Sequence, residues 1–261
     1  MPFTFAHPIY AIPLKYISPK YYNLTGLILG SMAPDFEYFL MLEPYSSIGH
    51  SIAGLFFQGI PMCLLIAVIF HFTVKESFVI HLPSIFNLNQ RAYNIMGEWG
   101  LRSLRDWIFF MLSVVVGFIS HITLDAFTHV HGYFVIRFSL LSEVLFFNLP
   151  LYKMLQHSLS VFGLLAIFVV IISRLYRSNP TIGGMPKVTR KQKKLFWLIA
   201  ITISVATTCL KLWITTSNNV IGIVVVSPIS GLCLGLVLTS LIARRTTRFQ
   251  KIDQTDMRND K

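Results

Sequence analysis

In the middle of the chain, residues 107–127 read WIFFMLSVVVGFISHITLDAF. Apolar side chains fill this stretch almost without interruption from Trp107 to Ile119. An α-helix needs about 20 such residues to cross the hydrocarbon core of a bilayer. The stretch therefore predicts a membrane-spanning helix, and this helix carries a histidine and an aspartate, His121 and Asp125, near its end.

Four further windows have the same length and apolar character. They are Ile52–Phe72, Met154–Ser173, Leu195–Ile214 and Val220–Ala243. A sixth window, Tyr22–Leu42, is long enough, but Gly30, Pro34, Asp35 and Glu37 interrupt it, which favours a broken or re-entrant element that lines a cavity. We therefore expect an all-α, polytopic helical membrane protein. It would have about five to six transmembrane helices plus an N-terminal broken or re-entrant helical segment.

The composition excludes a single soluble domain. The chain is 54% hydrophobic and 13% charged, against roughly 45–50% and 25% in soluble domains. The 22 Lys and Arg residues outnumber the 11 Asp and Glu residues, which gives a net charge of +11. Most of the basic residues belong to loops on one face of the predicted topology, and the positive-inside rule makes that face cytoplasmic. We expect a protein of the inner or plasma membrane with a cytoplasmic C-terminus, and no nucleic-acid partner.

The predicted spans and loops also suggest domain limits. Residues 1–173 form a membrane-embedded helical domain that carries the candidate site, 174–194 a basic cytoplasmic loop, 195–243 a C-terminal transmembrane hairpin, and 244–261 a basic-polar cytoplasmic tail. The basic run from Lys187 to Lys194 has two interpretations, a nucleic-acid patch or a surface that faces anionic lipid head groups. Its place beside a predicted helix favours the lipid head groups.

His121, Asp125 and His129 are each four residues apart. At about 100° per residue they fall within an arc of about 80° if the helix continues that far. An imidazole and a carboxylate one turn apart can bind one cation together, since nitrogen and oxygen donors both suit Zn²⁺ and similar divalent ions. The alternative is an intrahelical His–Asp hydrogen bond that tethers this helix end.

Two further histidines are expected on the same membrane face. His50 precedes one predicted helix, and His157 lies in the first turn of another. The predicted topology puts both of these helix ends, like the end that bears Asp125, on the extracytoplasmic face. The serines that follow, Ser51 and Ser158, leave open the alternative that both His-Ser pairs are simply helix N-caps.

The second polar feature is the Pro34-Asp35 corner. Pro34 removes a backbone donor and biases Ala33 away from helix, so Asp35 would begin a new helix and point its carboxylate into the break. Asp35 can also be interpreted as an N-cap. Glu37 fits either a group that orients a ligand histidine or an interfacial residue near the outer surface.

Several of these residues belong to motifs whose order resembles a known family. The motifs are Phe5-Ala-His7-Pro8, Gly30-Ser-Met-Ala-Pro-Asp35-Phe-Glu-Tyr-Phe39, Gly49-His50-Ser51, Gly117-Phe-Ile-Ser-His121-Ile-Thr-Leu-Asp125-Ala-Phe-Thr-His129 and Gln156-His157-Ser158. They cover most of residues 1–165, and with them the chain resembles the bacterial membrane proteins grouped as the domain-of-unknown-function 4184 family. More distantly, it resembles the inner-membrane proteins described as metal-dependent hydrolases.

The order of the polar residues is also similar to the ligand order of zinc-dependent phospholipase C and P1-type nucleases, helical enzymes that cleave phosphoesters with clustered zinc. The chain lacks the N-terminal Trp of that group, and Val161 stands where an acid would follow His157 by four residues. The distant hydrolases often have His-Arg-x-x-x-His-Ser where this chain has Tyr45-Ser-Ser-Ile-Gly-His50-Ser51. The resemblance therefore implies one or two metal ions rather than three.

The resemblance also adds His7 to the ligand set. It implies broken or interfacial helices for residues 1–42 on the outer half of the membrane, so that His7 can reach the other ligands. A full span over Tyr22–Leu42 would instead leave His7 in the cytoplasm, an arrangement that Lys15 and Lys20 favour.

Taken together, these features predict a metal-dependent hydrolase that acts on a phosphoester or lipid-type substrate at the extracytoplasmic membrane face. The expected metal ligands are His7, Asp35, His50, His121, Asp125, His129 and His157. The expected catalytic residues are Asp35 and Glu37, as acceptors of the proton from an attacking water. The expected cofactor is a divalent metal, first of all Zn²⁺, and the expected partners are the bilayer and anionic lipid head groups. The alternatives are an ion- or proton-coupled transporter, because intramembrane Asp and His also form relays, and a metal-stabilised scaffold.

Overall fold

The computed structural model describes residues 3–146, 148–180 and 184–259, with side chains as far as Arg244 except for residue 146. Five of its helical stretches are long and apolar enough to cross a membrane. They are Ile52–His81, Leu104–Arg137, Leu151–Arg177, Arg190–Ile214 and Val220–Arg244. Each of the predicted windows other than Tyr22–Leu42 lies inside one of these stretches, so the all-α, multi-pass class is confirmed.

The long stretches differ in how they are built. The first joins α5 (Ile52–Gly54), α6 (Ile60–Ile69) and α7 (Lys75–His81) through two π-helical turns, η3 (Leu55–Gly59) and η4 (Phe70–Val74). The second contains α9 (Leu104–Thr128) and α10 (Tyr133–Arg137). The other three correspond to α12 (Leu151–Arg177), α13 (Arg190–Ile214) and α14 (Val220–Asn259). Many of their apolar side chains are exposed, for example Phe162 and Phe168 on α12, as expected where lipid surrounds a helix.

The window Tyr22–Leu42 is broken, as the sequence predicts. It contains α3 (Leu24–Gly30), the 3₁₀ turn η2 (Ala33–Asp35) and α4 (Phe36–Met41). Pro34 lies in the first turn of η2, where its missing N–H leaves no helical hydrogen bond unmade. Three short elements precede this segment: η1 (Thr4–Ala6), α1 (Pro8–Ala11) and α2 (Pro13–Ile17). None of these pieces is long enough to span a bilayer.

The chain divides into two compact units. The first unit consists of Met1–Glu37, Ser46–Ala67 and Trp99–Ser173. The second unit consists of Tyr38–Tyr45, Val68–Glu98 and Arg174–Lys261. These limits are structural, and the domain limits expected from the sequence, with a boundary after residue 173, stay a prediction.

In the first unit, α3 packs against α9 over its whole length. The two backbones approach closely because Gly30 faces the backbone of Val114, where a Cβ on residue 30 would overlap the Val114 carbonyl oxygen. Helix α9 begins with a capping box between Ser103 and Asp106. After α10, the short α11 (Ser139–Ser142) and an antiparallel strand pair, β1 (Val144–Phe146) and β2 (Leu149–Pro150), lead into α12.

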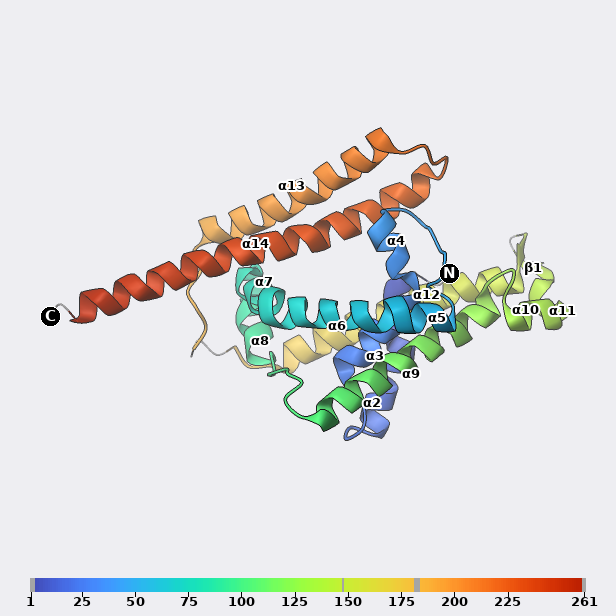
Figure 1. The fold of residues 1–261 in the computed structure, drawn as a ribbon, viewed down its shortest axis with the longest axis horizontal. Helices are drawn as coiled ribbons and strands as arrows, with labels where there is room; N and C mark the ends of the chain where they lie inside the picture. Colours follow the sequence, from blue (N-terminus) through green and yellow to red (C-terminus); the bar gives the residue numbers. More distant parts are fainter. Residues whose placement is uncertain (1–2, 147, 181–183, 260–261) are drawn as a thin grey trace. The chain divides into compact units, whose positions relative to one another are not determined.

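In the second unit, α13 and α14 run side by side over most of the length of α13 (Figure 1). Helix α13 begins with a capping box between Thr189 and Gln192. The shorter elements of the unit are η5 (Ile85–Asn87) and α8 (Leu88–Asn94). The backbone of α14 continues to Asn259, into the predicted basic-polar tail 244–261. The side chains of residues 245–261 lie outside the described part, so the charge distribution of this tail stays a prediction.

Candidate metal centre

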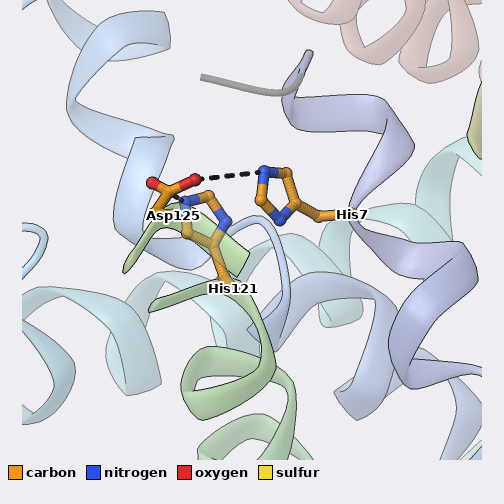
Figure 2. Close-up of side chains that lie close together, drawn as sticks. All are labelled: His7, His121 and Asp125. Atoms are coloured by element: carbon orange, nitrogen blue, oxygen red, sulfur yellow. Dashed lines mark hydrogen bonds and ion pairs between the residues drawn. The ribbon is translucent and has the colours of Figure 1, made fainter. Parts of the chain in front are cut away.

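Five of the predicted site residues come together in the first unit, from four separate segments. His7 lies between η1 and α1, Asp35 ends η2, His50 precedes α5, and His121 and Asp125 lie one turn apart on α9. Two groups of side chains have ligand atoms that all lie within 4.8 Å of one another: His7, His121 and Asp125, and Asp35, His50 and His121. Figure 2 shows how His7 reaches the carboxylate of Asp125 from the N-terminal segment.

Two histidine nitrogens of this cluster each lie near the same two carboxylate oxygens. The Nε2 of His50 lies 3.5 Å from Oδ1 of Asp35 and 3.4 Å from Oδ2 of Asp125. The Nε2 of His121 lies 3.8 Å from the same Asp35 oxygen and 3.1 Å from the same Asp125 oxygen. Four donors arranged tetrahedrally at about 2.0–2.1 Å from Zn²⁺ would lie about 3.3 Å from one another. The observed separations bracket this value.

The donor atoms are oriented by neighbouring groups. The carbonyl oxygen of Ser31 lies 2.7 Å from Nδ1 of His121. Because a carbonyl oxygen can only accept, Nδ1 carries the proton, and in the neutral ring Nε2 presents its lone pair to the cluster. The hydroxyl of Thr4 donates to Oδ2 of Asp35 at 2.6 Å and leaves Oδ1 for the cluster. Among the described residues, neither Oδ1 of Asp35 nor Nε2 of His50 has a hydrogen-bond partner.

Two buried carboxylates share this small volume. Asp35 is fully buried and Asp125 is 7% exposed. Burial raises the pKa of Asp35, against the lowering effect of His121 and of the Thr4 hydroxyl. All of the ion pairs that the two carboxylates make with described residues are with histidines. Such a set of buried groups needs protons or a cation to balance its charge.

Asp125 faces different partners with its two oxygens. Oδ2 lies near His50 and His121, as described above, whereas Oδ1 lies 3.8 Å from Nε2 of His7 and 3.5 Å from Nδ1 of His129. The ring of His7 stacks on that of His121, with centroids 3.8 Å apart. His121 therefore belongs to both groups, and Asp125 of the first group also lies near His50 of the second. The expected His121–Asp125 contact along the helix is present at 3.1 Å.

Glu37 holds the loop that carries His50. Its carboxylate accepts hydrogen bonds from the backbone N–H groups of Ser47, Ile48 and Gly49 and from the Ser47 hydroxyl, at 2.5–3.2 Å. Burial alone would raise the pKa of Glu37, but these hydrogen bonds lower it below its ordinary value. A Cβ on Gly49 would overlap the carbonyl oxygen of Pro34, so this close approach requires glycine. Glu37 thus holds the loop Ser47–Gly49 in place, and His50 follows this loop directly.

The remaining predicted ligands lie differently. His129 is the C-cap of α9, is about one-third exposed, and has Nδ1 3.1 Å from the backbone oxygen of Asp125. It belongs to neither ligand group. His157 is exposed, and it also lies outside both groups. Because α12 begins at Leu151, Ser158 lies inside the helix rather than at its N-cap.

The capping interpretations of the His50-Ser51 pair and of Asp35 have different outcomes. The side chain of Ser51 accepts from the N–H of Gly54 and caps α5, which leaves the ring of His50 to face Asp35 and Asp125. Asp35 ends η2 and accepts from the Thr4 hydroxyl. Sequence reasoning missed Thr4 and Ser31. No local pattern marks either residue, because Thr4 acts across the fold and Ser31 acts through its backbone.

Comparison with known proteins gives a family and no activity. A family model described as "Domain of unknown function (DUF4184)" matches residues 1–241. No curated protein and no solved structure matches the chain. The comparisons thus give no support to the more distant resemblance to metal-dependent hydrolases.

Proposed function

We propose that the His/Asp cluster of this chain, which belongs to the DUF4184 family, binds a divalent metal ion. The protein would then be a membrane-bound metal-dependent hydrolase. Its substrate class would be a phosphoester or a lipid-type ester at the extracytoplasmic face. What is established is a multi-pass helical membrane protein with buried His and Asp groups that can hold a metal. The chemistry and the membrane side are the proposal.

One observation carries the proposal: Nε2 of His50 and Nε2 of His121 each lie 3.1–3.8 Å from the same two carboxylate oxygens, Oδ1 of Asp35 and Oδ2 of Asp125. Most of these separations are too long for hydrogen bonds. With Nδ1 of His121 bonded to Ser31, its Nε2 faces carboxylate oxygens either as an imidazolium or across a cation. Two imidazole nitrogens and two carboxylate oxygens suit Zn²⁺ and related ions.

The chain's own residues would have distinct roles. Asp35, His50, His121 and Asp125 would hold the ion, and His7 would add a donor beside Asp125 Oδ1. A divalent cation supplies Lewis-acid chemistry, because it acidifies a coordinated water and stabilises negative charge on a phosphoryl or acyl oxygen. Burial of the ligands excludes bulk water and strengthens these electrostatic effects.

The two residues expected to be catalytic, Asp35 and Glu37, have different contacts, which support different roles. Asp35 has one oxygen directed into the cluster, so it can hold the ion or take a proton there. Both oxygens of Glu37 accept hydrogen bonds from the loop at Ser47–Gly49. We therefore assign Glu37 as a positioning residue. His129, about one-third exposed, lies beside Asp125. Its Nδ1 donates to the backbone oxygen of Asp125, so in the neutral ring Nε2 is the basic nitrogen.

The position of the cluster along α9 supports a membrane substrate. Asp125 lies three residues before Thr128, the last residue of α9, so it lies near the end of an apolar helix. A site at such a helix end lies at about the depth of lipid head groups, where ester and phosphoester bonds of lipids are found. The head group itself is not specified by these residues.

Elemental analysis tests the proposal. The purified full-length protein, prepared without chelators, should contain at least one equivalent of a transition metal, and His121→Ala and Asp125→Ala should lose it. His157→Ala is the matched control, because it removes an exposed histidine outside the cluster and should keep the metal. The wild type and variants are then assayed on a panel of phosphoesters and lipid esters. No metal in the wild type overturns the proposal, whereas metal without turnover supports the scaffold or transporter instead.

A further inference from the structure

A separate hollow lies within the second unit and shares no residue with the metal centre. Its volume is about 150 Å³, and it is lined by side chains from α7, from the segment before α13, and from α13 and α14. The polar part of the lining consists of His81, Lys187, Gln192 and Thr239, and the rest is apolar. The hollow therefore combines hydrogen-bond donors and a positive charge with an apolar wall.

His81 is a buried and firmly held member of this lining. It is 5% exposed, and its ring stacks on Phe196 with centroids 4.3 Å apart. Its Nδ1 lies 2.7 Å from the carbonyl oxygen of Ser77 and must donate to it. Its backbone oxygen accepts from the indole N–H of Trp197 at 3.0 Å. Among the described residues nothing hydrogen-bonds to Nε2, which is the ring nitrogen left for a ligand.

Gln192 and Lys187 bring further donors. The side-chain oxygen of Gln192 accepts from the N–H and the hydroxyl of Thr189, at 2.8 and 2.9 Å. Its amide N–H₂ therefore remains to donate into the hollow that Gln192 lines. Lys187 is exposed and carries the positive charge. The basic residues Arg190 and Lys191 follow in the first turn of α13 and Lys194 in the second, so a ligand there would be an anion.

The location of the hollow favours a lipid over a free anion as its ligand. Two of the candidate membrane spans have an end at the hollow: Ile52–His81 ends at His81, and Arg190–Ile214 begins just before Gln192. In the sequence of α14, the apolar stretch is followed by Arg244 and Arg245 directly after Ala243, which also lines the hollow. Ends of spans lie at the membrane interface. The apolar lining, with Leu195, Phe196 and Ile199, runs from this level along α13 in the direction that an acyl chain takes. A hollow of this size takes the head-group region rather than a whole lipid.

We propose that this hollow binds one anionic phospholipid from the leaflet that carries the basic loop. Lys187, the Gln192 amide and, when it is protonated, Nε2 of His81 donate to the phosphodiester oxygens, and the upper part of an acyl chain lies along Leu195 and Ile199. The interaction is specific because hydrogen bonds to neighbouring groups hold the side chains of His81 and Gln192 in place. It adds to the general attraction of the basic loop for anionic lipid.

Lipid titration of the delipidated full-length protein tests this site. Phosphatidylglycerol or phosphatidylcholine is added in neutral detergent, and bound lipids are counted by native mass spectrometry. We expect one phosphatidylglycerol to bind about tenfold more tightly than phosphatidylcholine. Lys187→Gln should weaken this binding about fivefold, the factor that corresponds to about 1 kcal/mol per basic residue. Lys191→Gln removes the same charge from an exposed residue outside the lining and should change the affinity less than twofold.

Each other outcome contradicts the proposal. Equal affinity for the two lipids would exclude an anion site, and equal effects of Lys187→Gln and Lys191→Gln would leave only the general attraction of a basic surface. Displacement of the lipid by millimolar inorganic phosphate would show a free-anion site. Val188 lines the hollow, and in Val188→Trp the larger side chain would fill it, so this variant should no longer bind the first phosphatidylglycerol. If this variant fails to fold, the comparison of Lys187→Gln with Lys191→Gln still tests the proposal.

Discussion

Nδ1 of His121 and the carbonyl oxygen of Ser31 lie 2.7 Å apart, and this contact joins α9 to the end of α3. It fixes the ring so that Nε2 faces Asp35 and Asp125. The contact depends on how closely the two helices approach, which Gly30 permits. The packing of two apolar helices thus sets the orientation of the His121 ring, as hydrogen bonds to the second ring nitrogen of a ligand histidine do in known metal sites.

Gly30→Ala should therefore disturb the cluster from a distance. The added Cβ would overlap the Val114 backbone, so the helices must separate, at a cost of about 1–3 kcal/mol. We expect a lower thermal unfolding temperature in detergent and a metal affinity reduced about tenfold. Gly59→Ala is the control in the same unit, because its Cβ would meet only ordinary contacts at 3.5 Å or more. Equal effects of the two variants would mean that the α3–α9 approach does not set the site.

Glu37→Gln tests the positioning role of that carboxylate. The variant loses the charge that accepts four hydrogen bonds from the loop before His50. We expect the metal affinity to fall about tenfold, within the range known for outer-shell partners, and Glu37→Ala to lower it further. Calorimetric metal titration of each variant measures this. Glu143→Gln changes an exposed acid in the same unit and should leave the affinity unchanged.

A direct catalytic role for Glu37 predicts a different result. In that case Glu37→Gln would keep its metal affinity and lose only turnover, because the loop would stay in place. The comparison of metal affinity with turnover therefore distinguishes positioning from proton transfer.

Much of the fold could be predicted because membrane spans are recognised from length and hydropathy alone. The break at Pro34 followed from the missing backbone donor, and the pairing of His121 with Asp125 followed from helical periodicity. These are local properties, so one sequence suffices to find them.

The rest of the site depends on tertiary contacts. The hydrogen bond from Thr4 to Asp35 spans 31 residues, and the carbonyl of Ser31 could belong to any residue type. The start of α12 at Leu151 rather than at Met154 likewise places His157 in the second turn of the helix instead of the first, since residues before an apolar window can extend a helix. His7 entered the expected ligand set only through the family resemblance.

His7→Ala should distinguish the two ligand groups, which share His121. His7 lies near Oδ1 of Asp125, whereas His50 and His121 lie near Oδ2. We expect His7→Ala to lower the number of bound ions by at most one and to keep an ion at His50 and His121. His121→Ala should abolish all binding, because both groups contain this imidazole. Elemental analysis measures the ratio of metal to protein.

His131→Ala is the control for the His7 variant, since His131 is exposed and belongs to neither ligand group. Complete loss of metal in His7→Ala would contradict the division into two groups. It would place His7 among the ligands of a single ion.

The ion pair between Glu43 and Lys211 in the second unit should make stability depend on pH. Lys211 Nζ lies 2.9 Å from Oε1 of Glu43, and both side chains are mostly buried. This hydrogen bond holds the pKa of Glu43 below its ordinary value, which is about 4.3. The carboxylate therefore stabilises the fold above about pH 4.3, and this contribution is lost as the pH falls through the lowered pKa.

Thermal unfolding of wild type and Glu43→Gln in detergent, from pH 7 down to pH 3.5, checks the sign. At pH 7 the variant should be less stable by about 0.5–1 kcal/mol, the usual contribution of such a pair. The difference should shrink as the pH falls, because protonated Glu43 then resembles Gln. Glu76→Gln is the control, since Glu76 and Arg244 are 4.0 Å apart and each nearly half exposed, so little effect is expected at any pH. A difference for Glu43→Gln that stays constant down to pH 3.5 would mean that lost packing, and not the charge of Glu43, causes it.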